Sequence, residues 1–228
     1  GRAFVDALLD AEPNCLGGGF RAALHRHTEG HALFTVELLR AMKEHGALVR
    51  NGRGEWVEGS APAWEELPPR VEAVIAERIE RLPLPLRGLL QAASVQGETF
   101  SLEVLARSLP AGSELGEAAE GRLAWLLGEQ LGRRHGLLHA DLRPAFERPG
   151  PPLLRYRFTH ALHQTYLYGS LDAAQRAWLH RQVGAALEAI YSPAALSNAE
   201  LAALLAWHHA QARPACLQYS PTTGAPTT

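Results

Sequence analysis

Residues 153–160, LLRYRFTH, decide how the second half of the chain folds. Within this stretch Tyr156 and Phe158 alternate with Arg155 and Arg157. A period of two places alternate side chains on opposite faces of a sheet, so the pattern predicts a strand with one apolar face. The helical pattern of ALHQTYLYG begins directly after it, which predicts that the strand leads into a helix without a long loop.

The residues before this strand complete a recognisable order of elements. The apolar spacing predicts helices at 86–95, 102–109 and 121–134, with Ser101 as the N-cap of the second, and a strand at 136–139. The proline-rich segment RPAFERPGPP then forms a loop between the two strands. Three helices, a strand, a loop and a strand predict a winged helix-turn-helix.

Two further helices are expected after the strand. Asp172 with Gln175, and Ser197 with Glu200, have the spacing of capping boxes at helix starts. The last helical pattern, AELAALLAWHHAQA, is typical of the first helix of a repeat array. The segment 213–228 is polar and rich in turn residues, and we expect it to be disordered.

The first part of the chain predicts a separate helical subdomain. Two short helices are followed by a break at Gly30 and by a longer helix over 31–45, whose polar stripe consists of Glu37, Arg40 and Glu44. ALVRNGRGEWVE, residues 47–58, predicts a β-hairpin. The expected fold is therefore mainly α, and its predicted segments are a lid subdomain with a hairpin at 1–64, a winged helix at 65–171, array helices at 172–212 and a tail at 213–228.

Composition limits the classes of partner. The net charge is −2 and 46% of the residues are hydrophobic, so no excess of positive charge indicates nucleic acid or an anionic membrane. Two cysteines far apart favour a reducing, cytoplasmic compartment, and the absence of a long apolar run predicts no membrane span. Residue 1 is Gly and is followed by a helical pattern, which suggests a fragment of a longer protein.

No local catalytic motif is present in the sequence. There is no phosphate-binding G-x-x-x-x-G-K-[ST], no G-x-S-x-G, no H-E-x-x-H and no C-x-x-C, so no catalytic residue is assigned. His25 and His27 are two residues apart on a helix and point in directions about 200° apart, so they cannot share a metal ion. We therefore disfavour a metal site around His31 as well, because Gly30 interrupts the path.

His160 is the histidine with the clearest chemistry. It ends the predicted strand and begins a helix, where free backbone N–H groups and the helix dipole favour an anion. A neutral imidazole at this position could donate a hydrogen bond to a phosphate. The alternative is a structural histidine that ties the wing to the next helix.

Four segments together resemble a known family. They are HTEGHALFTVELLRAMKEHGALV, ELPPRVEAVIAERIERLP, LLQAASVQGETFSLEVLA and YRFTHALHQTYLYGSL. They resemble the C-terminal half of the ATPase module of bacterial signal-transduction ATPases with numerous domains, which are relatives of the AAA+ class. The resemblance covers residues 1 to about 212. Such proteins carry adenylate cyclase, kinase or DNA-binding domains elsewhere and a tetratricopeptide array downstream.

The resemblance implies a role in a nucleotide-controlled switch. The phosphate-binding and acidic motifs for ATP/ADP and Mg would lie upstream, and this chain would supply the lid, the winged helix and the start of an array for protein partners. Of the family's lid motif R-T-x-G-N-P-L-F the chain keeps Thr28, Gly30, Leu33 and Phe34. His27, His31 and Ala32 replace Arg, Asn and Pro, and Ala32 loses the fixed φ of the proline.

The implied nucleotide contacts are His160, His31 and Gly30. His160 matches the position at which relatives place a histidine that senses phosphate. Release of ADP and binding of ATP would then open the module and promote self-association.

Two alternatives from other classes remain. A winged-helix DNA-binding transcriptional regulator would need basic residues on its third helix, and Arg133 and Arg134 lie at the end of that helix. The segment 84–160 contains nine Arg, no Lys and eight acidic residues, which makes DNA binding the weaker hypothesis. A hydrolase or metal enzyme is the third hypothesis, and no group of residues supports it.

Overall fold

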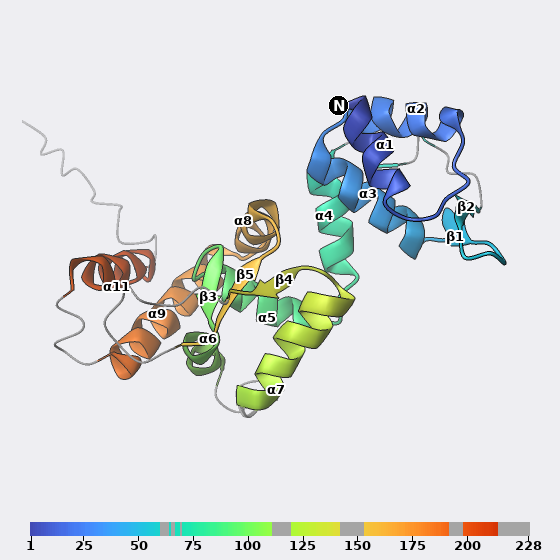
Figure 1. Ribbon diagram of the computed structural model, residues 1–228. Helices are drawn as coiled ribbons and strands as arrows, with labels where there is room; N and C mark the ends of the chain where they lie inside the picture. The colour runs from blue at the N-terminus through green and yellow to red at the C-terminus, as the bar shows by residue number, and fades with distance from the viewer. Residues whose placement is uncertain are drawn as a thin grey trace, which may run out of the picture. The chain divides into compact units, whose positions relative to one another are not determined.

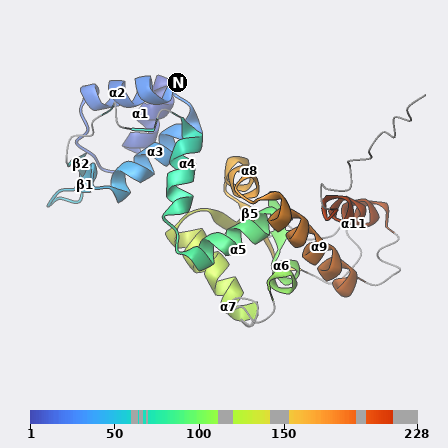
Figure 2. The same cartoon turned by 180° about the vertical axis from the view of Figure 1, so that it is seen from behind.

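The computed structural model describes residues 1–59, 64, 67–68, 70–110, 120–141, 153–191 and 198–213. The chain is mainly helical with two small antiparallel sheets, in agreement with the expected fold class. It divides into two compact units, Gly1–Leu82 and Pro83–Thr228. Figure 1 shows the elements of each unit in colour order along the chain, and Figure 2 shows them from behind.

The first unit consists of four helices and a hairpin. The elements are α1 (Arg2–Asp10), α2 (Gly18–Thr28), α3 (Ala32–Glu44), β1 (Leu48–Arg50), β2 (Trp56–Glu58) and α4 (Val71–Glu80). The predicted hairpin is confirmed, because β1 and β2 pair antiparallel with Val49 opposite Val57. Helix α3 ends one residue before the predicted boundary, and Gly46 follows it with φ of +74°, a conformation that favours glycine at a helix end.

Helix α4 belongs to the first compact unit, which ends at Leu82, whereas the predicted lid subdomain ends at residue 64. The helix packs on α3, and its Val74 is part of the apolar core that includes Leu24 and Leu38. Residues 65, 66 and 69 of the predicted linker lie outside the described residues. The unit therefore continues to Leu82 because α4 covers the apolar face of α3.

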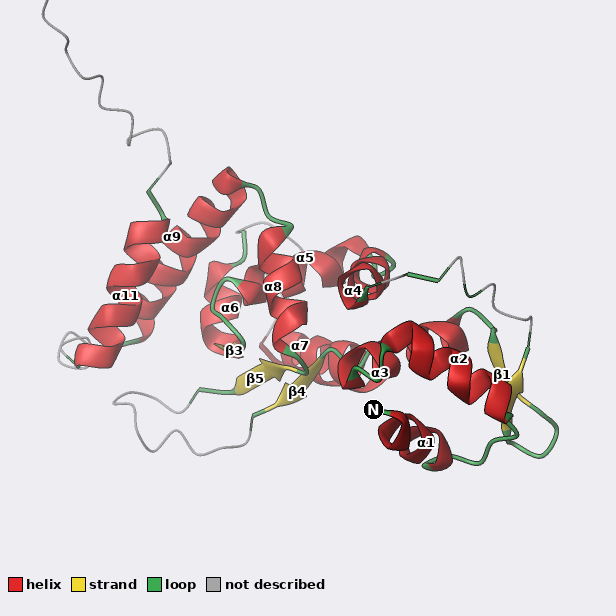
Figure 3. Cartoon of the chain, turned by 90° about the horizontal axis from the view of Figure 1, so that it is seen from above, coloured by secondary structure: helices red, strands yellow, loops and turns green. Residues whose placement is uncertain are grey.

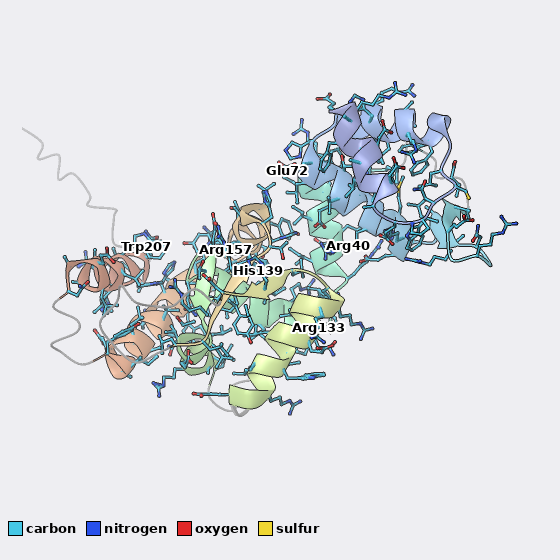
Figure 4. All side chains as sticks on the ribbon, in the orientation of Figure 1. Arg40, Glu72, Arg133, His139, Arg157 and Trp207 are labelled. Atoms are coloured by element: carbon cyan, nitrogen blue, oxygen red, sulfur yellow. The ribbon has the colours of Figure 1, made fainter. Side chains whose placement is uncertain are left out.

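Glu37, one of the three residues of the predicted polar stripe, is buried inside this unit. Its carboxylate forms a buried ion pair with Arg78 of α4, and only 2% of Glu37 is exposed. Arg40, labelled in Figure 4, is half-buried one turn further along α3. Burial, followed by the nearby charge of Arg78, lowers the pKa of Arg40. The polar stripe on α3 therefore faces α4 in part. Arg78, the partner of Glu37, lies 41 residues away in sequence.

The second unit contains the described helices and strands from α5 to α11. Its elements are α5 (Leu84–Ser94), β3 (Thr99–Ser101), α6 (Leu102–Ser108), α7 (Glu120–Trp125), η1 (Leu126–Arg134), β4 (Leu138–Ala140), β5 (Arg155–Phe158), α8 (Ala161–Gly169), α9 (Ala173–Ile190) and α11 (Ala199–Gln211). The strand order is β3-β5-β4, with antiparallel pairing throughout. The strand β3 was not predicted.

Strand β5 is the central strand of this sheet. Its Tyr156 and Phe158 are buried, and their rings contact the buried ring of Phe100 from β3. The predicted alternation of apolar and basic residues is therefore confirmed. The loop 142–152 lies outside the described residues.

Three local predictions for this unit have different outcomes. The predicted third helix exists, but its second half, η1, is a π-helix, with i→i+5 hydrogen bonds such as His135 N–H to the Gln130 carbonyl. Ser101 precedes α6 as its N-cap residue, but its side chain makes no capping hydrogen bond. The capping box of Asp172 and Gln175 is confirmed, since both of its hydrogen bonds are present.

The last two helices do not form a compact unit of their own. Helix α9 packs on α6 and on α11, and Figure 3 shows α9 and α11 side by side. The N-cap of α11 is Asn198, whose side chain accepts from the N–H groups of Glu200 and Leu201, so the assignment of that cap to Ser197 was one residue early. Ser197 itself and the tail 214–228 lie outside the described residues.

The buried ion pair between α3 and α4 gives a first prediction. The substitution Glu37→Gln leaves the Arg78 charge buried without its counterion, and we expect a loss of about 3–5 kcal/mol in the unfolding free energy of the first unit. Urea denaturation, with hydrogen exchange of the α3 and α4 amides to identify the unit, measures this loss.

The control is Glu44→Gln on the same helix, because Glu44 is exposed and its change should have little effect. The double variant E37L/R78M removes both charges and should be as stable as the natural chain within about 1 kcal/mol, or more stable. If the double variant is as unstable as Glu37→Gln, the buried charge of Arg78 is not the cause of the instability.

Candidate functional site

His31 is the N-cap residue of α3. Its Nδ1 accepts a hydrogen bond from the Phe34 N–H at 3.3 Å, and its side chain is exposed. Gly30 precedes it with φ of +71°, and a Cβ at Gly30 would lie 2.7 Å from the Cα of Gly1. Glycine is required at this position because of both the left-handed conformation and the close approach of the backbone.

His27 has a structural role in the first unit. Its Nε2 lies 2.9 Å from the carbonyl oxygen of Pro68, and its ring contacts the rings of Phe34 and Trp64. His25 lies on another side of α2, where its Nε2 is close to Gly30. The two histidines therefore point to different neighbours, as their spacing on a helix predicts.

His160 is the N-cap residue of α8. Its Nδ1 accepts from the Leu162 N–H at 3.1 Å, and the residue has the extended backbone of a cap, with φ of −145°. A ring nitrogen that accepts a hydrogen bond carries no proton, so the neutral ring has its proton on Nε2. His160 is half-buried. The other ring nitrogen, Nε2, therefore carries an N–H donor at the start of α8, which is the positive end of the helix dipole.

His31 and His160 share one local arrangement. Each is followed by Ala and Leu, in GHALF and THALH, and each uses Nδ1 to cap its own helix. Sequence reasoning selected both residues but missed this repeat, which is visible as the tripeptide His-Ala-Leu at two helix starts. Gly30 and His31 belong to the first unit and His160 to the second.

A second group of polar residues was not anticipated from the sequence. The Nδ1 atoms of His180 on α9 and His208 on α11 lie 2.9 Å apart, and the Tyr168 hydroxyl of α8 lies 3.0 Å from Nε2 of His180. His180 is 0% exposed and His208 is 1% exposed. Trp207, labelled in Figure 4, packs edge-on against both rings. The signal for this group is weak, because the two histidines are 28 residues apart.

Burial sets the protonation of this pair. Desolvation first, and then the charge of Arg176, lowers the pKa of His180 to about 4. Desolvation, and then the neighbouring His180 and His209, lowers the pKa of His208 to about 4. Both rings are therefore neutral at pH 7, and one Nδ1 donates to the other. The adjacent His209 faces away and lies 3.1 Å from Glu188.

The described residues contain no group of three or more His, Cys, Asp or Glu side chains placed to hold a metal ion. In the same part of the chain, no helix has the length and apolar character needed to cross a membrane. A scan against models of protein families and a search of curated proteins found no match to this sequence.

The histidine pair gives a second prediction, on pH dependence. A folded pKa near 4, below the unfolded value of about 6.5, gives a stabilisation that is complete above pH 6.5 and is lost as pH falls toward 4. With two such groups the unfolding free energy of the second unit should fall by up to about 2.7 kcal/mol per pH unit. Denaturation between about pH 6.5 and 5, above the main titration range of carboxyl groups, measures it.

The matched control is His209→Gln, which changes an exposed neighbour and should leave the slope unchanged. His208→Gln removes one of the two titrating groups and should reduce the slope by about half. A stability that does not change over this range in the natural chain would mean that the two buried histidines do not control it.

Proposed function

We propose that this chain is the non-catalytic C-terminal portion of an ATP/ADP-dependent signalling or transcription-regulatory ATPase. In this proposal the first unit is a helical lid, residues 83–171 are a winged helix, and α9 and α11 begin a tetratricopeptide-like array. The chain couples the nucleotide state to protein partners of that array. Catalysis and the binding of Mg belong to a segment upstream of Gly1, and the protein is cytoplasmic.

The order of elements in the second unit supports the winged helix. Helix α5, strand β3, helix α6, the combined helix α7 and η1, and strands β4 and β5 follow one another, and the sheet order is β3-β5-β4. This is the order of a helix-turn-helix followed by a wing of two strands, which would be β4 and β5. The short strand β3 pairs with the other edge of β5. The strand β5 then leads directly to His160.

The observation that carries the proposal is the cap made by His160. Because Nδ1 accepts from the Leu162 N–H, the proton of the neutral ring is on Nε2. A donor at the start of a helix is suited to a phosphate oxygen. His31 offers the same group in the first unit, at the position where the resembling family has Asn.

A third prediction tests His160 in the longer polypeptide that the proposal requires. His160→Asp keeps a good helix cap but replaces the N–H donor by a negative charge. We expect its ADP affinity, measured by calorimetry, to fall by about tenfold or more, which is about 1.4 kcal/mol. The stability of the second unit should change little, because Asp caps a helix as well as any residue.

The control for this experiment is His139→Asp. His139 is exposed on β4, so the substitution makes the same change of side chain away from the cap. Figure 4 labels His139 on its strand. An unchanged ADP affinity in His160→Asp, together with unchanged ATP-driven assembly, would remove the sensor role.

The exposed side of α7 and η1 supports the second candidate function, a winged-helix DNA-binding regulator. Trp125 is 54% exposed, and Arg133 and Arg134 are exposed at the end of η1. Arg133, labelled in Figure 4, lies 3.5 Å from Glu129 on the same helix. The acidic partner reduces the positive field that a DNA phosphate would meet, which is why we rank this function second.

A fourth prediction separates the two functions. The main proposal expects no salt-dependent binding of duplex DNA by this chain at low salt, in a fluorescence anisotropy titration. Binding that weakens in R133A/R134A, but not in the control Arg181→Ala on the exposed side of α9, would establish the DNA-binding alternative.

A further inference from the structure

A cavity of about 220 Å³ lies inside the second unit, away from His160. Its lining residues come from strands β3 and β5 and from helices α6, α9 and α11. The walls are of two kinds. The apolar and aromatic lining residues are Phe100, Val104, Val183, Leu187, Tyr191, Leu201 and Leu204, and the polar ones are Gln96, Thr99, Ser101, Arg155 and His208. A space with one apolar and one polar part suits a small amphipathic molecule.

The polar part carries a positive charge without a negative one. None of the described residues that line the cavity is acidic, and Arg155 of β5 is the arginine among them. In the part of the chain that the structure describes, the Arg155 guanidinium has no carboxylate within ion-pair distance. Arg157, two residues along the same strand, lies 3.5 Å from Glu98. The cavity therefore contains a cation whose counterion is not supplied by the described residues.

Hydrogen-bond donors accompany this charge. Thr99 and Ser101 of β3 bring hydroxyl groups to the lining, and Gln96 is fixed beside them because its Oε1 accepts from the Ser101 N–H at 3.0 Å. Hydroxyl groups rotate to donate to an oxygen that arrives, so they add to the attraction for an anion.

His208 of α11 provides a further donor. It is 1% exposed and lines the cavity, and its Nδ1 faces His180. In one tautomer the Tyr168 hydroxyl donates a hydrogen bond to Nε2 of His180. The Nδ1–H group of His180 then donates a hydrogen bond to Nδ1 of His208, so the proton of the neutral His208 ring is on Nε2. That N–H has no partner among the described side chains. An anion in the cavity selects this tautomer.

We propose that this cavity binds a small organic carboxylate. Arg155, with the donors of Thr99, Ser101 and His208, holds the carboxylate group, and the leucine side chains of α9 and α11 enclose the hydrocarbon part. The ligand thereby joins the sheet to α11, and its binding favours the docked position of that helix. The proposal does not depend on the nucleotide switch, because it uses neither His160 nor His31.

A fifth prediction tests the proposal with hexanoate as the probe and the full chain as the protein. Calorimetry should give saturable binding of one hexanoate per chain with a dissociation constant of about 1 mM or lower. Hexanamide has the same shape without the charge and should bind at least about tenfold more weakly. Hydrogen exchange of the α11 amides should slow when hexanoate is present, because binding to the folded state stabilises it.

Substitutions then locate the site. Arg155→Gln should weaken hexanoate binding at least about tenfold, and Arg155→Lys should retain part of the affinity, because a charge remains. The matched control is Arg157→Gln, which removes an arginine from the same strand but not from the cavity. The exchange pattern of the sheet amides confirms that each variant is folded.

Three results would overturn the proposal. They are equal binding of hexanoate and hexanamide, an affinity that Arg155→Gln does not change, and the absence of saturation up to about 10 mM. Inorganic phosphate serves as a second probe. If it binds through Arg155 while hexanoate does not, the site selects an inorganic anion, and the assignment of a carboxylate is wrong.

Discussion

The second unit depends on the position of one strand, β5. Its backbone pairs with β3 on one edge and β4 on the other, so its N–H and carbonyl groups are satisfied on both sides. The same pairing fixes which side chains face the core. Tyr156 and Phe158 pack on Phe100, and Arg155 is left to line the cavity. A shift of one residue would exchange these faces and bury the arginines, so the register is strongly specified.

The end of β5 also determines where the proposed sensor lies. Thr159 is followed at once by His160, and the Thr159 N–H donates to the Leu137 carbonyl. The strand therefore holds the residue that begins α8. The Nδ1 atom of His160 accepts a hydrogen bond from the backbone of α8, and this bond restrains the ring. The orientation of Nε2–H is therefore set by the backbone and not by a freely rotating side chain. The two proposed sites, at His160 and at Arg155, share this strand but use different ends of it.

Features that depend on neighbours in sequence could be predicted, and features that depend on distant partners could not. The hairpin at 47–58, the cap at Gly46 and the capping box at Asp172 are local, and each is present in the structure. Strand β3 has three residues, and it becomes a strand only because β5 pairs with it. The candidate His160 came from a local change of period, whereas the cavity at Arg155 needs five elements to exist.

Two buried pairs join helices that are far apart in the sequence. Glu37 with Arg78 joins α3 to α4, and His180 with His208 joins α9 to α11. A buried ion pair gains little over apolar packing, but either partner alone is costly, so such pairs select one arrangement of helices over others. The histidine pair adds a condition to this selection, because burial lowers the pKa of both rings and protonation therefore costs stability. The packing of α11 on α9 therefore becomes less favourable as the pH falls toward 4.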